Sequence, residues 1–475
     1  MLKDIVGGFG DILKDLFSTW EIWLAIFVAG LIGSFLVPFT GPSSIWRAFL
    51  YFLEYTWWLW VFIILFNLFK ELWLHYKREM YKKSLKWVLL ELRVPRNIQK
   101  SPQAMEQVLT AIHALRNAPS DFKEKYIEGE VTRWFSLEMA SFGGEIHFYI
   151  RIYAGLKNLV EASFFSYYPD IDIIEVPDYI DRLPKSVTSM YEEGFDLWGT
   201  EMLLQKEELY PIKTYADFEA SPDEEKRFDP ISSFLEVMGK LMKDEFVGIQ
   251  LLIAPTGKDP MTDHDKWLDD SKGELEELRQ QSKRTKTEIN PGEGEFSMFT
   301  MRSPRQTEIL KAVEENLSKP AFETLARFVY ISPRATFTDS YPRRGLIGAF
   351  SQYAALDMNG FTQNYNVSTR TKLWSSPYIF PKTRGEYRKA RILFDYKERE
   401  IPPESLVGRV MTSYFFNWNA SRNFLMNTKC IATLFHIPTS IVLTEPHLRH
   451  LESRKTGPPA GLAIFGADEE IERYK

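Results

Sequence analysis

Cysteine is almost absent from this chain of 475 residues. Cys430 is the single cysteine, so no disulfide can form within the chain, which fits a reducing compartment. Net positive charge is also missing, because 58 basic and 64 acidic residues give a formal net charge of −6. This balance argues against a protein devoted to nucleic acid, although it leaves room for a local basic surface.

Signatures of nucleotide, metal and nucleophile chemistry are missing as well. The nearest string to a phosphate-binding loop, PTGKDP at 255–260, has no Ser or Thr after its lysine and lacks the preceding glycine. His447 and His450 have no HExxH pattern or cysteine partner, which favours a surface pair over a metal site. Cys430 could act as a nucleophile with His436, but a buried small side chain is the favoured interpretation. We therefore expect no catalytic residues, no metal and no cofactor.

Long apolar runs are confined to the first 75 residues. Residues 22–37 read IWLAIFVAGLIGSFLV, and residues 48–69 read AFLYFLEYTWWLWVFIILFNLF. A bilayer-spanning helix takes about 17–25 mostly apolar residues. The second run has this length, and the first reaches it only with the aromatic residues that flank it. Since a short connector, TGPSSIW, separates the runs, the sequence predicts a transmembrane helical hairpin over residues 21–75.

Basic residues give the hairpin an orientation. Six follow the second run, namely Lys70, Lys77, Arg78, Lys82, Lys83 and Lys86. The connector offers Arg47 alone, at its edge. Because Lys and Arg accumulate on the cytoplasmic side, we expect a multi-pass protein of the inner (cytoplasmic) membrane with both termini and the soluble body in the cytoplasm. A cleaved signal peptide is the rival interpretation of the first run, and the acidic Asp4, Asp11 and Asp15 weigh against it.

Residues 1–20 have a pattern of their own. Apolar residues such as Ile5, Phe9 and Ile12 recur at helical spacing, with charged residues opposite. This predicts an amphipathic helix that lies in the membrane interface. Packing of the same helix on the soluble body is the alternative.

The soluble body begins with strands and helices in the order βαββαβ over residues 84–180. The expected elements are a strand at 86–95, a helix from Ser101, a hairpin that turns at Gly143 and Gly144, a helix over 156–167 and a strand at 171–176. Strands are predicted by alternation, as in Ile146, Phe148, Ile150 and Ile152, and helices by one apolar face. This order is typical of the ferredoxin-like arrangement, an antiparallel sheet with helices on one face.

The same order recurs over residues 195–375. The expected elements are strands at 198–212, 246–254, 322–331 and 365–374, with helices after Asp229 and over 344–357. A polar insertion at 257–320 interrupts this unit and contains two helical stretches, near 266–286 and 304–318. The insertion is either a solvated charged face or a docking arm. Residues 376–475 are expected to form an irregular mixed tail. The predicted fold class is α+β, with a transmembrane hairpin followed by two tandem ferredoxin-like units.

Basic and aromatic residues gather near the start of that tail. They are Arg370, Lys372, Trp374, Lys382, Arg384, Tyr387, Arg388, Lys389 and Arg391. Such interleaving suits phosphate contact and base stacking, so the segment is a candidate contact for nucleic acid or anionic lipid. A solvated loop, or one paired with the acidic Asp395, Glu398 and Glu400, is the alternative.

Several blocks, taken in order, resemble one known family. They include LKWVLLELRVPRNIQKSPQAMEQVLTAIHAL, FSLEMASFGGEIHFYIRI, WGTEMLLQKEELYPIKTYADFE, FVYISPRATF, NTKCIATLFHIPT and LESRKTGPPAGLAIFG. Over residues 86–466 the chain is similar to the membrane-anchored region that precedes, or is encoded beside, HerA/FtsK-class ATPases of conjugation and type IV secretion-like systems. The family supplies no catalytic residues to transfer. Where the ATPase is fused, the Gly-Pro-Pro segment leads into it. Here the chain stops at Lys475, so the resemblance implies a separate motor.

The expected function is therefore a non-enzymatic scaffold in the inner membrane. It would form homo-oligomers and dock a separate hexameric HerA/FtsK-class ATPase of a transfer machine. One alternative is a nucleic-acid-binding module that guides DNA at the membrane through the basic segment. Another is a self-assembling membrane-domain scaffold.

Overall fold

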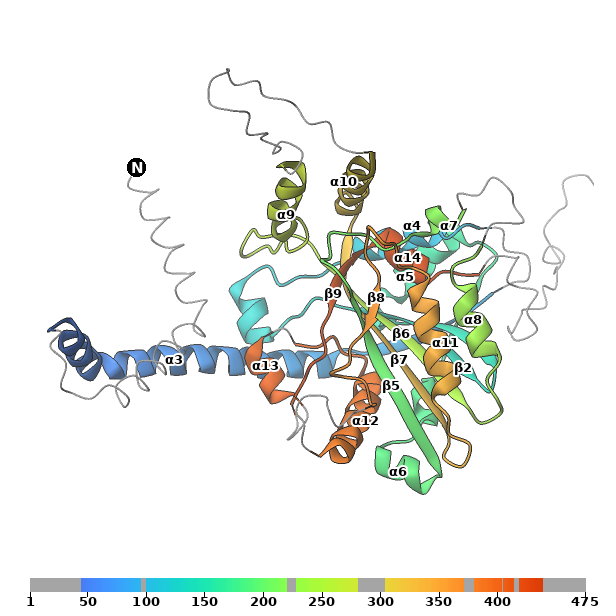
Figure 1. Cartoon of the computed structure of the whole chain (residues 1–475), viewed down its shortest axis with the longest axis horizontal. Coiled ribbons are helices and arrows are strands. Elements are labelled where there is room, and N and C mark those ends of the chain that lie inside the picture. Colours follow the sequence, from blue (N-terminus) through green and yellow to red (C-terminus); the bar gives the residue numbers. More distant parts are fainter. Residues whose placement is uncertain are drawn as a thin grey trace, which may run out of the picture.

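The computed structural model of the chain describes residues 44–94, 100–219, 228–280, 304–370, 380–403, 405–413 and 418–438 (Figure 1). Three predicted features lie outside these residues: the amphipathic helix over 1–20, the first apolar run at 22–37, and the end of the tail from 439.

A nine-stranded antiparallel sheet forms the centre of the body, in the order β4-β1-β3-β2-β6-β7-β5-β8, with β9 paired to β7. The strands are β1 (Trp87–Arg93), β2 (Phe135–Phe142), β3 (Glu145–Tyr153), β4 (Asp172–Val176), β5 (Phe195–Leu204), β6 (Phe246–Pro255), β7 (Ala321–Pro333), β8 (Phe361–Gln363) and β9 (Phe424–Asn427). From its outer edge toward the centre, the first half has the strand order β4, β1, β3, β2, and the second half has the order β8, β5, β7, β6. Each half therefore has the same order of its four strands: fourth, first, third and second along the chain. The halves meet where β2 pairs with β6, so an approximate two-fold in the strand order passes between these strands.

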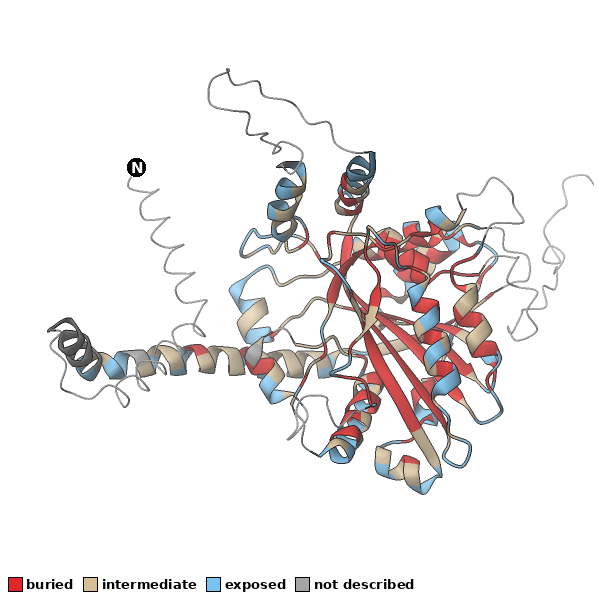
Figure 2. Ribbon diagram, viewed as in Figure 1, coloured by how far each residue is buried: buried red, intermediate tan, exposed pale blue. Residues whose placement is uncertain are grey.

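One face of the sheet is apolar. Alternate residues of each strand point to the same side, and on this side they include Leu90, Leu137, Ile150 and Leu251, all fully or almost fully buried. The helices that cover this face are α4 (Gln103–His113), α5 (Lys157–Tyr167), α8 (Ser232–Gly239), α11 (Ser340–Ser351) and α14 (Thr428–Leu434). Figure 2 shows the strands buried beneath them. Burying each such side chain stabilises the fold by about 1.5–3 kcal/mol.

The opposite face carries six polar side chains in strand register, here called the polar row. Paired across neighbouring strands, they run in the order Glu91, Tyr149, Glu138, Gln250, Arg327 and Glu201. All six are buried. The approximate two-fold relates Glu91 to Glu201, so each half contributes three members of the row.

Three elements cover the polar row: η3 (Tyr179–Arg182), α6 (Val187–Glu192) and the long α12 (Pro381–Glu398). The last turn of α12 is bonded to it directly. Arg327 Nη1 donates to the carbonyl of Asp395 at 2.6 Å, and Gln250 Nε2 donates to the carbonyl of Tyr396 at 2.9 Å. Because buried polar groups need partners, these bonds fix where α12 ends on the sheet.

Two ion pairs complete this arrangement. Arg327 donates to Glu201 at 2.8 Å, and Ser421 adds a hydroxyl to the same carboxylate at 3.0 Å. Arg399, directly after α12, donates to Glu138 at 2.9 Å. Burial is the largest single influence and lowers the pKa of Arg399, but Glu138, Tyr179 and Asp178 together outweigh it and raise that pKa. Burial raises the pKa of Glu201, although Arg327 acts against the shift.

The second apolar run is part of one long helix, α3 (Ser44–Ser84), of 41 residues. At about 1.5 Å per residue it is about 60 Å long. Its N-terminal part projects beyond the body (Figure 1). Within it, Glu54–Ser84 is long and apolar enough to cross a membrane, and 12% of the most apolar window is buried in the protein.

Several predicted boundaries of the second half differ from the structure. The strand predicted at 198–212 ends at Leu204, because the Asn359 side chain holds the next residues in a loop by bonds to the amides of Gln205 and Lys206. The prediction of a strand at 365–374 is wrong for the part that the structure describes, residues 365–370. The pairing strand is β8, and Asn364 then turns the chain by accepting a bond from the amide of Asn366.

The insertion contains two helices near the predicted positions, α9 (Leu268–Gln280) and α10 (Pro304–Leu317). They stand side by side beyond one end of the sheet (Figure 1) and are joined by an ion pair between Arg279 and Glu314 at 2.8 Å. Residues 281–303 between them are outside the described part.

The tail from 376 is less irregular than predicted. It contains α12, α13 (Leu406–Met411), β9 and α14. The sequence hides α12 because arginines occupy part of its inward face, and it hides β9 because four residues are too few for a clear alternation.

Candidate functional site where the long helix enters the body

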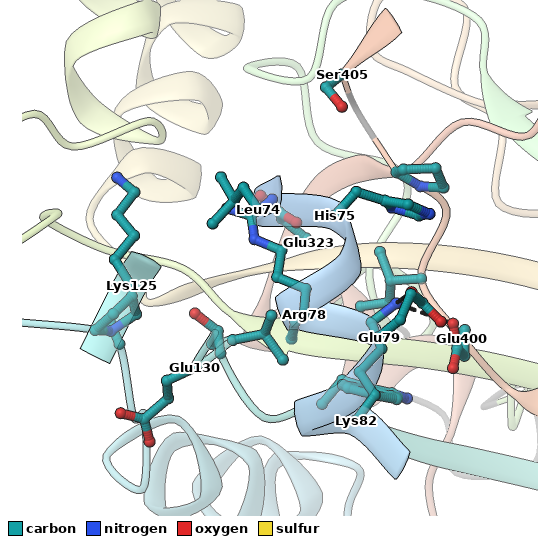
Figure 3. Close-up of a pocket in the computed structure, with 18 of the residues that line it drawn as sticks. Leu74, His75, Arg78, Glu79, Lys82, Lys125, Glu130, Glu323, Glu400 and Ser405 are labelled. Atoms are coloured by element: carbon teal, nitrogen blue, oxygen red, sulfur yellow. Dashed lines mark hydrogen bonds and ion pairs between the residues drawn. The ribbon is translucent and has the colours of Figure 1, made fainter. Parts of the chain in front are cut away.

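A cavity of about 660 Å³ lies where α3 meets the body, here called the entry cavity (Figure 3). One face of α3 lines it, with Glu71, Leu74, His75, Arg78, Glu79 and Lys82. These positions are spaced three or four apart, so they form one stripe along the helix. The remaining walls come from residues 116–134, the end of β6 with Asp259 beyond it, Glu323 of β7, and residues 400–412.

The first wall is η1 (Lys123–Glu128), a π-helical turn that packs against α3. Trp73 Nε1 donates to the carbonyl of Tyr126 at 2.7 Å, and the Tyr81 hydroxyl donates to Glu130 at 3.0 Å. Gly129 ends the turn with a φ of 76°. A Cβ there would lie 2.5 Å from the backbone of Lys77, so glycine is needed for this close approach.

The facing wall is the segment between α12 and α13. The Nζ atom of Lys82 lies 2.9 Å from a carboxylate oxygen of Glu79 and 2.9 Å from one of Glu400. Dashed lines in Figure 3 mark these ion pairs. Arg399, next to Glu400, belongs to the ion pair with Glu138. The wall of the cavity is therefore continuous with the polar row on the sheet.

Charges of both signs line the entry cavity. Lys125 and Glu130 lie across it from Glu79 and Glu400 (Figure 3). Within the described parts of the chain, no three His, Cys, Asp or Glu side chains are placed to hold a metal ion. Such a mixed lining suits contact with a polar headgroup or a peptide segment, and it holds α3 in place through paired charges.

The structure turns much of the predicted basic segment inward. Arg384, Arg388 and Arg391 lie on the buried side of α12, each no more than 7% exposed. Arg388 donates to the carbonyls of Tyr365 and Ser368, both at 3.0 Å. Arg391 Nη1 donates to the carbonyl of Thr412 at 2.8 Å. All three arginines are buried away from a phosphate in solvent, and Arg388 and Arg391 bond α12 to its neighbours instead.

The remaining members of that segment are divided. Lys389 is paired with Asp196 at 2.6 Å. Arg370, Lys382 and Tyr387 are exposed. Lys372 and Trp374 lie outside the described residues. The segment is therefore not one continuous basic surface where the structure describes it.

Cys430 and His436 do not form a nucleophile with its base. Burial raises the pKa of the Cys430 thiol to about 12. Both ring nitrogens of His436 are engaged elsewhere, Nε2 with Asp229 and Nδ1 with the carbonyl of Ala432, each at 2.8 Å. Lys258, in the string that distantly resembles a phosphate loop, is paired with Asp263 on the surface.

Sequence reasoning missed both the entry cavity and the polar row. The spacing of the polar residues from Glu71 to Lys82 was a usable signal, because it marks one helix face beyond the apolar run. Glu130 and Glu400 gave no signal, since nothing local relates residues so far apart in the chain.

No curated protein matches the chain significantly. The model of a family described as a domain of unknown function, DUF8128, matches residues 67–448. The match begins within α3 and takes in all nine strands and every residue that lines the entry cavity. The chain therefore belongs to the DUF8128 family.

Proposed function

We propose that this protein is a membrane-anchored platform, in which α3 crosses the bilayer and the body binds other proteins at the cytoplasmic surface. The observation that carries the proposal is the division of α3 into two parts. From Leu59 to Phe69 its large apolar side chains are mostly exposed, and from Glu71 to Lys82 its polar stripe lines the entry cavity, where Lys82 is paired with Glu400 of the body. An apolar helix surface of this kind is stable in lipid.

The junction between helix and body supports a rigid platform. β1 begins three residues after α3 ends, and η1 and α13 pack against α3 from the body. No flexible linker of the Gly/Ser or Pro-rich kind separates the two parts. The orientation of the body would thus follow the orientation of the helix.

The finer topology is part of the same proposal. With residues 22–37 as a first span, the protein is a multi-pass hairpin with both termini in the cytoplasm. Each half of the body is a ferredoxin-like unit. Its strand order, and helices such as α4 and α5 packed together on one face, support this assignment.

The proposed partners are further copies of the chain and a separate HerA/FtsK-class ATPase. The resemblance of the sequence blocks motivates the ATPase, and the projecting pair α9 and α10 offers a surface for it. Long insertions of this kind commonly carry binding.

Labelling with a membrane-impermeant thiol reagent tests the topology. Cys430 is buried, so an introduced cysteine is the site that reacts. Leu356 is 98% exposed on the body, and Leu356→Cys should react only after the cells are opened. Ser43→Cys, in the connector, should react in intact cells. Reaction of Leu356→Cys in intact cells would contradict a cytoplasmic body.

Contact with DNA is the second candidate function, and one observation favours it. Arg343, Arg344 and Arg370 line a cavity of about 760 Å³ beside β8. Duplex DNA should then bind with an affinity that falls as salt rises, with a slope of about −0.9 per phosphate neutralised. Arg344→Ala with Arg370→Ala should weaken binding, and Lys243→Ala, elsewhere on the surface, should not. Binding that ignores both salt and these arginines would remove this candidate.

A further inference from the structure

Large apolar side chains are exposed on two short elements beside α3. At η1, Phe122 is 63% exposed and Ile127 is 53% exposed. At α13, Val410 is 48% exposed and Met411 is 57% exposed. Exposed apolar residues are common singly, but these four flank the helix that is apolar enough to cross a membrane.

Both elements pack against α3 near the point where it leaves the body. Figure 1 shows α13 on one side of α3 and the turn at residues 123–128 on the other. The ring of Phe122 lies 4.7 Å from that of Tyr126, whose carbonyl accepts the bond from Trp73. Phe122 is therefore level with Trp73, about one helical turn beyond Phe69, the last residue of the second apolar run.

We propose that η1 and α13 form a collar, defined by Phe122, Ile127, Val410 and Met411, that enters the headgroup region of the bilayer crossed by α3. This inference rests on the proposed membrane anchor. Four residues of helix from Phe69 to Trp73 correspond to about 6 Å, which is the depth of the interface that amphipathic elements occupy. Trp73 itself is 40% exposed, and tryptophan is enriched at this level of membranes.

The charges of the collar favour an apolar mode of binding. On η1, Lys123 is paired with Glu128 at 2.8 Å, and the second lysine, Lys125, is offset by Glu124. On α13, Arg409 is the charged residue. With Asp121, which lies just before η1, the three basic residues Lys123, Lys125 and Arg409 are matched by three acidic ones, so the region carries no excess of positive charge. The collar should therefore insert into neutral phosphatidylcholine and should not depend on anionic lipid or on low salt.

Depth-dependent quenching in vesicles tests the collar on the full-length protein. Ile127→Cys and Met411→Cys would carry a polarity-sensitive fluorophore, in phosphatidylcholine vesicles whose lipids bear a nitroxide near the headgroup. We expect both labels to lose most of their fluorescence. The control is Leu356→Cys, which is more exposed than either label site but distant from α3, and its fluorescence should not change. Trp58→Cys on α3 reports the span, and a nitroxide deep in the acyl chains should quench it.

The outcomes separate the collar from the anchor. Quenching of Trp58→Cys without quenching of Ile127→Cys and Met411→Cys would overturn the collar and leave the span intact, with another protein as the occupant of these side chains. Absence of quenching at Trp58→Cys would contradict the anchor itself.

A second variant tests the apolar mode. Val410→Asp should abolish quenching at Met411→Cys while leaving Trp58→Cys quenched, because a carboxylate opposes entry into the interface. Leu356→Asp should change neither signal. Quenching of the collar labels that requires phosphatidylserine, or that is lost at high salt, would overturn apolar insertion as its cause.

Discussion

The two faces of the central sheet achieve burial by different means. One face is filled by alternating apolar residues such as Leu137 and Ile150, which pack against helices from both halves. The other face holds the polar row, whose side chains form hydrogen bonds and ion pairs with η3, with α12 and with Arg399 directly after α12. Apolar contacts tolerate many arrangements of similar volume, whereas a buried charge tolerates few. We infer that the apolar face supplies most of the stability, and that the polar face determines where α12 lies.

The largest effect is expected from a charge placed on the apolar face. Ile150 is fully buried, and Ile150→Asp should lower the free energy of unfolding by about 4 kcal/mol or more, because the carboxylate has no partner there. Denaturant titration of the protein in mild detergent measures this. Ile150→Val is the matched control, with a loss of about 0.5–1.5 kcal/mol. A fully stable Ile150→Asp variant would mean that this face is not the core.

Breaking one ion pair of the polar row should have the next largest effect. Glu201→Ala leaves Arg327 buried without its carboxylate, at a cost of about 3 kcal/mol. The double variant Glu201→Leu with Arg327→Met replaces the pair by apolar groups and should recover much of that loss. If the row positions α12, the double variant should still expose α12 to proteolysis or hydrogen exchange. Normal protection of α12 in the double variant would count against this role.

A smaller effect is expected at the hydroxyl of Tyr179, which bonds to Glu138 at 2.5 Å and to Tyr396 at 2.7 Å. Tyr179→Phe keeps the ring and removes both bonds, so it should cost about 1–3 kcal/mol. Tyr341→Phe, on the surface of α11, is the control and should cost almost nothing. Equal stability of the two variants would show that the hydroxyl of Tyr179 is dispensable.

The smallest effect should appear at acid pH. A hydrogen bond from His147, together with Arg93, holds the pKa of Glu91 at about 2, below its usual value near 4.5. A lowered pKa stabilises the fold above the unfolded value, so this contribution is complete above about pH 4.5 and is lost as the pH falls toward 2. Glu91→Gln should flatten the fall in unfolding free energy below pH 4.5. If the unfolding free energy of the variant falls below pH 4.5 as steeply as that of the unmodified protein, other carboxylates cause the fall.

The sequence predicted the apolar face better than the polar one, for a physical reason. The hairpin at Gly143 and Gly144, with the alternation that begins at Ile146, is a local pattern, and the structure has it as β2 and β3. Strands were also predicted at 246–254 and 322–331, and the structure has them as β6 and β7. On the polar face, Glu138 and Arg327 interrupt the apolar pattern of their strands. Their burial is explained by their ion-pair partners, Arg399 and Glu201. Those partners lie far away in the chain.

The basic segment shows the same limit. Arg384, Arg388 and Arg391 were predicted as candidate contacts for nucleic acid or anionic lipid because basic and aromatic residues interleave in this segment. They recur at helical spacing, however, and lie on the inward face of α12 beside Ile392 and Tyr396. The entry cavity could be predicted in part, from the stripe on α3, but not its walls at Glu130 and Glu400.

The direct passage from α3 into β1 has a consequence for assembly. In a membrane, such a junction would hold every copy of the body at one height and one tilt above the lipid. The projecting helices α9 and α10 would then move in a single plane, with rotation about the membrane normal as their main freedom. Encounters between copies become a search in two dimensions, which raises their effective concentration without any new contact. A weak surface on each body could then be enough to build an ordered array.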